Sequence, residues 1–144
     1  MYEFHGWASL RYHTHDTNEQ LQEQGVQEFL AYLEQVDTSN LCHVHRYNGQ
    51  DSFLISGMHN HIATYVTGIF DWIASRLPGS YGLLYIQDDE DSGGSWDHEN
   101  EFIVWRLARG AVTREKDPFL SPYIPTVEDP YDPSTVDHAK SRED

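Results

Sequence analysis

The dipeptide Asn48-Gly49 is the feature of this sequence that most limits its fold. It separates two runs of strand-forming residues, LCHVHRY at 41–47 and SFLISGM at 52–58. Asn-Gly between two such runs is the strongest short-range signal for a β-hairpin. A hairpin this short joins strands that run antiparallel. We therefore predict a fold built around an antiparallel sheet.

Four more segments have the composition of strands. Residues 2–15 alternate loosely and are rich in aromatic side chains, and Gly6 marks a bulge or a close approach of the backbone. We expect Trp7, next to this glycine, to fill the core. The other three predicted strands lie at 82–86, 102–107 and 111–115.

Two helices are expected between these strands. Thr17 and Gln20 form a capping-box pattern that opens the first helix, which continues to about Val36. The second helix follows a cap at Asn60 and runs to about Leu77. The apolar stripes predicted to face the core are Val26, Phe29, Leu30 and Leu33 in the first helix, and Ile62, Tyr65, Val66, Ile69, Trp72 and Ile73 in the second.

The predicted order of elements is strand, helix, strand, strand, helix, strand, strand, strand. Hairpin connections, with both helices packed on one face, describe an α+β domain with an antiparallel sheet of about five or six strands. The chain has 144 residues, which is enough for one domain with a real core. We place this domain at residues 1–117.

The chain after residue 117 has a different composition. Five of the six prolines lie there, at 118, 122, 125, 130 and 133, and such a stretch cannot be regular structure. Its apolar side chains can pack along the domain as an extended Pro-rich C-terminal strap, which we place at 118–133. Residues 134–144 are polar, and we expect a frayed tail. The apolar side chains of the strap are Phe119, Leu120, Tyr123 and Ile124.

The chain is strongly acidic, with 24 Asp and Glu against 9 Lys and Arg and a net charge of -15. Such a surface repels nucleic-acid phosphates and anionic lipids, and it attracts basic partners. The N-terminus lacks the basic start and apolar stretch of a signal peptide, and no run approaches the ~20 apolar residues of a membrane span. We expect a cytosolic protein that binds neither nucleic acid nor membranes.

The acidic residues are densest in QDDEDSGGSWDHENE, residues 87–101, and no Lys or Arg lies between Arg76 and Arg106. Seven carboxylates this close repel one another unless a cation neutralises them or water screens them. Next to an aromatic anchor, such a loop can steer a basic protein partner and then hold it. A solvated loop without a partner is the alternative. The predicted partner-binding residues are Asp88, Asp89, Glu90, Asp91, Trp96, Asp97 and Glu99.

Two metal-binding patterns are alternatives to this interpretation. Counted from Asp88, the loop resembles the calcium loop of helix-loop-helix sites, but the predicted flanks are strands rather than helices. Three His-x-His pairs could each turn two imidazoles toward one ion. We assign no metal ligand, and a small ligand- or metal-binding module that uses these pairs remains the alternative function. The pairs are His13 and His15, His43 and His45, and His59 and His61.

No set of catalytic residues can be singled out. The carboxylates are too many to select an acid–base pair, and the sequence has no Gly-x-Ser-x-Gly elbow and no phosphate-binding glycine loop. Cys42 and His43 are adjacent in a predicted strand and point to opposite faces, so they cannot act as nucleophile and base. Cys42 is the single cysteine, cannot form an intramolecular disulfide, and is expected to be buried and inert. We assign no catalytic residue and no cofactor.

Five longer strings carry more specific information than composition does. They are YEFHGWASLR, SGMHNH, PGSYGLLYIQDDED, FIVWRLARG and DPFLSPYIPTVEDP, and they extend from residue 2 to about residue 130. Together they resemble the immunity protein 7 family of bacterial polymorphic toxin and contact-dependent competition systems. The density of histidines and the loop around Trp96 depart from the family pattern.

The resemblance implies a small cytosolic protein that binds and neutralises the C-terminal domain of a cognate toxin. It implies no enzymatic activity. Toxins of this kind are often nucleases, whose active-site grooves are basic because they hold phosphate. An acidic protein can occupy such a groove in place of the nucleic acid. The nuclease is an inference from charge, since the resemblance itself does not fix the class of toxin.

Overall fold

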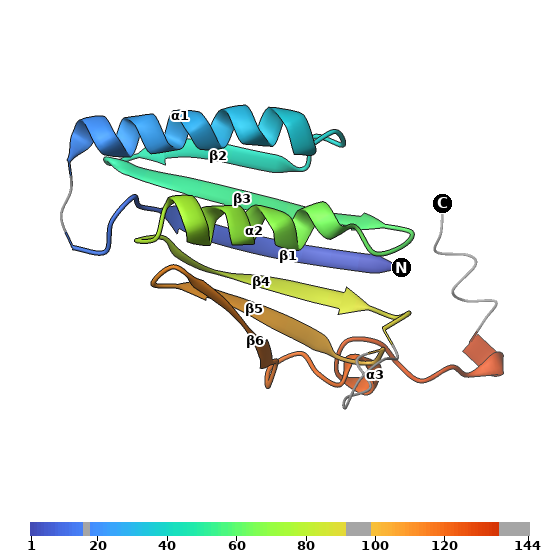
Figure 1. Cartoon of the computed structure of the whole chain (residues 1–144). Coiled ribbons are helices and arrows are strands. Elements are labelled where there is room, and N and C mark those ends of the chain that lie inside the picture. Colours follow the sequence, from blue (N-terminus) through green and yellow to red (C-terminus); the bar gives the residue numbers. More distant parts are fainter. Residues whose placement is uncertain (16–17, 92–98, 136–144) are drawn as a thin grey trace.

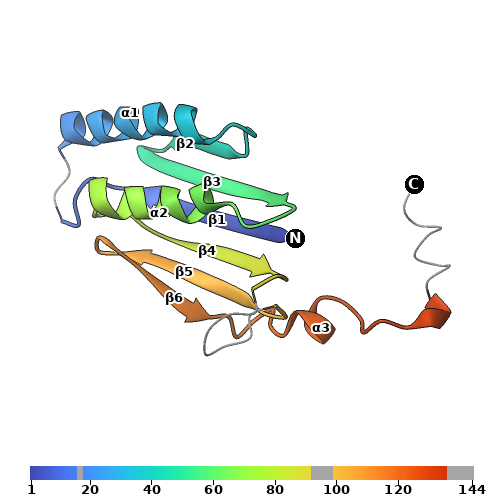
Figure 2. The same ribbon diagram turned by 45° about the vertical axis from the view of Figure 1, so that its right-hand side comes forward.

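A six-stranded antiparallel sheet carries two long helices on one of its faces (Figures 1 and 2). The computed structural model describes residues 1–15, 18–91 and 99–135. Its strands lie in the order β2-β3-β1-β4-β5-β6. The elements are β1 (Tyr2–Leu10), α1 (Glu19–Val36), β2 (Cys42–Tyr47), β3 (Gln50–His59), α2 (Thr64–Arg76), β4 (Tyr81–Asp88), β5 (Phe102–Ala108) and β6 (Ala111–Lys116). The predicted α+β class and order of elements are confirmed.

Two tight hairpins form the outer parts of the sheet. Asn48 and Gly49 both have positive φ angles, 52° and 80°, and Tyr47 pairs with Gln50 across the turn. Two central residues with positive φ define the turn whose twist matches that of the flanking strands. Arg109 and Gly110 repeat this arrangement between β5 and β6, with φ of 51° and 76°. The chemistry of these turns therefore fixes the pairing of both edge strands.

Both helices begin at positions other than those predicted. The cap of α1 is Asn18, whose Oδ1 accepts hydrogen bonds from the backbone N–H groups of Gln20 and Leu21 at 3.0 and 3.1 Å. The predicted cap, Thr17, lies outside the described residues. Helix α2 begins at Thr64 rather than after Asn60, and Ala63 at its cap position has no side-chain acceptor. Ile62 therefore precedes the helix and is exposed, although its spacing placed it on the buried stripe.

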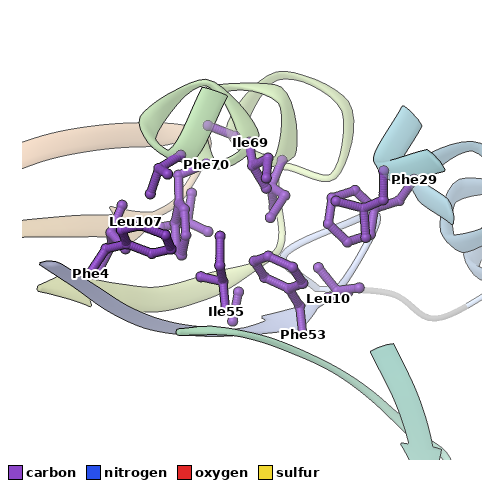
Figure 3. Packing of buried hydrophobic residues seen from close by; sticks show 14 of the residues in the cluster. Phe4, Leu10, Phe29, Phe53, Ile55, Ile69, Phe70 and Leu107 are labelled. Atoms are coloured by element: carbon purple, nitrogen blue, oxygen red, sulfur yellow. The ribbon is translucent and has the colours of Figure 1, made fainter. Parts of the chain in front are cut away.

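The core lies between the sheet and the two helices (Figure 3). Phe4 of β1 and Phe53 of β3 point toward Phe70 of α2 and Phe29 of α1, and all four side chains are fully buried. Gly6 belongs to this layer. A Cβ on Gly6 would lie 2.8 Å from the Leu84 side chain and 3.0 Å from that of Phe70. The β1–β3 register runs unbroken through Gly6, so it provides close packing and not a bulge.

The Pro-rich segment returns to the sheet through one buried carboxylate. Asp117 accepts hydrogen bonds from the backbone N–H groups of Phe119 and Leu120, each at 2.8 Å, and from the Ser121 hydroxyl at 2.9 Å. The Tyr123 ring then packs on Phe102, with centroids 5.8 Å apart. Phe119, which was predicted to pack, is 74% exposed.

This segment also contains two short turns. They are α3 (Tyr123–Thr126) and the 3-10 turn η1 (Pro133–Thr135). Ile124, the residue before Pro125, has an extended backbone with φ of -105° and ψ of 118°, so α3 is kinked and is not a continuous helix. Most of the predicted tail, 136–144, lies outside the described residues. No helix in the described part of the chain is long and apolar enough to cross a membrane.

Candidate functional site

The acidic residues predicted to bind a partner lie where β4 leaves the sheet. Asp88 is the last residue of β4, and Asp89 and Glu90 form the exposed turn that follows it. We call residues 88–91 the acidic turn. Glu99 lies at the other end of the connection to β5 and is exposed. Trp96 and Asp97 lie outside the described residues, so their place in this surface stays a prediction.

Part of the negative charge of the acidic turn is matched within the protein. The Asp89 carboxylate lies 2.8 Å from the N-terminal ammonium of Met1. The Glu90 carboxylate lies 2.8 Å from Nδ1 of His61, and this hydrogen bond lowers the pKa of Glu90 below its ordinary value. The backbone N–H of Glu90 also donates to Asp88 Oδ1 at 3.0 Å. These contacts order the turn while leaving its carboxylates largely in water.

The carboxylates of the acidic turn are the best placed metal ligands in the described part of the chain. One oxygen each from Asp88, Asp89 and Glu90 lie within 4.8 Å of one another. Exposed acidic groups gather in this way without any ion, and the flanks here are strands β4 and β5 rather than the two helices of a calcium loop. The group therefore does not by itself identify a metal site.

The His-x-His pairs do not converge on a common centre. His43 and His45 lie on one exposed face of the edge strand β2. His59 Nε2 is 2.8 Å from the Tyr65 hydroxyl, whereas His61 contacts Glu90. No histidine belongs to a cluster of three possible ligands among residues 1–15, 18–91 and 99–135. The pairs therefore have structural partners or face water separately.

The sheet face opposite the helices is a second candidate surface, which the sequence interpretation missed. Trp7 was predicted to fill the core, and this prediction is wrong. Side chains alternate along a strand, so with Phe4, Gly6 and Ala8 turned toward the helices, Trp7 must point the other way. Its side chain is 41% exposed. The buried glycine beside it was the signal that could have revealed this orientation.

Neighbouring strands extend this exposed apolar surface, which we call the open face. Trp7 pairs with Leu54 of β3 and with Leu83 of β4, so the three side chains form a row across the sheet. The Trp7 ring also makes an edge-to-face contact with Tyr81 at 6.1 Å. Leu54, Met58 and Tyr81 are exposed to about the same degree as Trp7.

Two hollows shape the open face. The larger has a volume of about 530 Å³ and lies around Trp7, Leu54 and His43. The smaller, of about 420 Å³, lies between the sheet and the returning C-terminal segment, with Leu120, Tyr123 and Val127 as its wall and Glu3, Tyr85 and Phe102 among its other lining residues. His5 and Tyr85 line both hollows, so the two hollows adjoin each other on the open face, and together we call them the groove.

Among the described residues that line the groove, Glu3 is the one with a carboxylate. Its carboxylate lies 2.6 Å from Nε2 of His5, and the side chain is only 19% exposed. Burial raises the pKa of Tyr123, and the negative charges of Glu3 and Glu128 raise it further. Two carboxylates therefore place negative charge near the end of the groove that the C-terminal segment closes.

Comparison with known proteins identifies one family. A family model described as Immunity protein 7 matches residues 1–129 of the chain. The match covers all six strands, both long helices and the C-terminal segment that closes the groove. No curated protein and no solved structure gives a match.

Proposed function

Because the chain belongs to the immunity protein 7 family, we propose that it binds the C-terminal domain of a cognate toxin and neutralises it. The observation that carries this proposal is the family match over residues 1–129. The role is one of binding, without a catalytic step or a cofactor. The protein would act in the cytosol, protecting the cell that makes the toxin and its kin.

The charge of the acidic turn favours a toxin with a basic surface. With a net charge of -15, the protein attracts cationic surfaces, and residues 88–91 concentrate this charge at one place. We infer that Asp88, Asp89, Glu90 and Asp91, with Trp96, Asp97 and Glu99, contact the toxin. A nuclease fits this requirement best, because the groove that holds its substrate phosphates must be basic.

Salt-dependent binding kinetics test the proposal. Opposite charges across an interface mainly raise the association rate, and salt weakens this attraction once the Debye length falls to about 8 Å. The partner in this test is the C-terminal domain of the cognate toxin, in a form without toxic activity. We expect association to slow markedly between low and physiological salt, while dissociation changes little. Surface plasmon resonance measures both rates.

Neutralising the acidic turn tests whether these residues are responsible for the fast association. The variant Asp89→Asn, Glu90→Gln, Asp91→Asn keeps Asp88, which accepts the backbone hydrogen bond of the turn. We expect association to slow by about tenfold or more. The matched control neutralises three acids of α1, by Glu19→Gln, Glu28→Gln and Glu34→Gln. An equal effect of the control would show that the overall charge, or the face of α1, steers the toxin instead.

Two further measurements complete the test. Trp96→Ala should speed dissociation, with a cost of about 2 kcal/mol or more in binding if this ring is a buried anchor. In cells that produce the active toxin, the wild-type protein should restore growth, and the acidic-turn variant should restore it poorly. Absence of any complex between the wild-type protein and the cognate toxin domain would contradict the proposed function itself.

A further inference from the structure

The open face carries large apolar side chains at exposed positions. Antiparallel sheets that face solvent alternate apolar residues inside with polar residues outside. Here the outward positions include Trp7, Leu54, Met58 and Tyr81, all more than a third exposed. Contiguous exposed apolar patches of this kind mark interaction surfaces. The helices cannot cover them, because both lie on the other side of the sheet (Figures 1 and 2).

The shape of the open face suits an inserted segment rather than a flat partner. The two hollows adjoin at His5 and Tyr85, so the groove extends from His43 on the edge strand to the wall formed by Tyr123. Its floor is rigid because it consists of paired strands. Rigid, partly enclosed aromatic surfaces are where interfaces concentrate their binding energy.

The negative charge of the groove favours a bound segment that is positively charged. Among the described residues that line the two hollows, Glu3 is the one carboxylate, and none is Lys or Arg. Because Glu3 is largely shielded from water, a cation placed beside it is screened less than one at the open surface. Tyr85, which lines both hollows, and Trp7 offer aromatic faces on which a guanidinium or the stem of a lysine can lie.

We propose that the open face holds the toxin, and that the segment it receives carries an apolar side chain next to an arginine or lysine. The apolar side chain lies over Trp7 and Leu54, and the cation lies beside Glu3. This inference rests on the proposed function and deepens it by separating two tasks. The acidic turn speeds encounter from a distance, whereas the groove sets how long the complex lasts.

Two substitutions at Leu54, one that introduces a positive charge and one that introduces a negative charge, test both the apolar contact and the cationic contact. Leu54→Lys and Leu54→Glu each remove the same apolar side chain from an exposed site, and they introduce charges of opposite sign. Against the inactivated toxin domain, we expect Leu54→Lys to speed dissociation by about a hundredfold and Leu54→Glu by about tenfold. The matched controls are Leu21→Lys and Leu21→Glu, which alter an exposed leucine of α1 and should change dissociation less than about twofold.

Removing the charge of Glu3 tests the site of the cation. Glu3→Gln keeps the size of the side chain, and we expect dissociation to speed up by about tenfold with little change in association. Glu28→Gln on α1 is its control. Melting curves recorded by circular dichroism establish that each variant is folded, so that a loss of binding is not a loss of structure.

The outcomes separate this inference from the proposed function. If the wild-type protein binds the toxin domain and the Leu54 and Glu3 variants bind equally well, the inference is overturned and the proposed function stands. Equal weakening by Leu54→Lys and Leu54→Glu overturns the cationic segment. A dimer of the protein alone that Leu54→Lys dissociates, seen by sedimentation velocity, makes a second copy the occupant and overturns the inference as well. If the wild-type protein does not bind the toxin domain at all, both the proposed function and this inference are overturned.

Discussion

The two faces of the sheet are built from the same strands, but the apolar side chains are buried on one face and exposed on the other. Phe53 and Leu54 are neighbours in β3, yet Phe53 is fully buried under the helices and Leu54 is 42% exposed. The contrast repeats in β1 between Phe4 and Trp7. Apolar residues on the helix-covered face stabilise the fold, whereas those on the open face remain available to a partner. Apolar character alone therefore does not show whether a side chain belongs to the core.

The largest expected effect comes from truncating the helix-covered face. Phe53→Ala removes a ring packed against Phe29 and Phe70, with centroids 5.2 and 5.9 Å away. We expect the free energy of unfolding to fall by about 3–5 kcal/mol, because a cavity remains in the core. Urea denaturation followed by circular dichroism measures the change.

Leu54→Ala is the matched control for this comparison. Its side chain is already exposed, so the free energy of unfolding should change by less than about 1 kcal/mol. Equal losses at the two positions would mean that the open face is covered in the free protein, and the distinction between the faces would fail.

Removing the C-terminal segment gives the next largest effect. A chain that ends at Asp117 loses the Tyr123 ring from Phe102 and the hydrogen bond from the Phe102 backbone N–H to Ser121 Oγ. We expect a loss of about 2 kcal/mol or more, because Phe102 then faces water. A chain that ends at Pro133 should lose less than about 0.5 kcal/mol. An unchanged melting temperature for the shorter chain would show that the segment adds nothing to this side of the sheet.

Cys42 was predicted to be buried, but in the structure it is only partly buried, packed against the core from the edge strand β2. Burial, with help from the nearby Asp37 carboxylate, raises the pKa of Cys42 to about 12. At pH 8 the folded protein should therefore react with a disulfide reagent much more slowly than the same protein in urea. Between pH 9 and about 12 the folded state keeps a proton that the unfolded state loses, so this group makes the protein less stable as pH rises. Equal reaction rates in the folded and unfolded protein would contradict this burial.

The smallest effect is expected from removing metal. If neither the acidic turn nor the histidine pairs are ligands, an excess of EDTA should leave the melting temperature unchanged. The purified protein should contain no stoichiometric zinc, iron or calcium by elemental analysis. One equivalent of metal that survives dialysis, with a lower melting temperature in EDTA, would favour a small ligand- or metal-binding module over a toxin-binding protein.

Local signals predicted the fold well wherever the chemistry of a few adjacent residues decides the backbone. Asn48-Gly49 and Gly110 gave both hairpins, because their positive φ angles are local properties. The start of α2 could not be found in this way. Ile62 has the spacing of a helical stripe, but the backbone turns at residues 60–63 before the helix begins at Thr64. Periodicity identifies a helix and leaves its first turn undetermined.

The candidate site, too, was predicted from the sequence only in part. Composition by itself determined that the protein is acidic and that residues 87–101 concentrate the charge, and the strings that resemble immunity protein 7 identified the family that the match over residues 1–129 confirms. Only the tertiary structure decided what the apolar residues of β1 and β3 face. Alternation defines two sets of side chains in a strand, but it does not say which set the helices cover. The helices pack on the side of Gly6, where a Cβ would collide with Leu84 and Phe70, and this leaves Trp7 and Leu54 exposed on the other side.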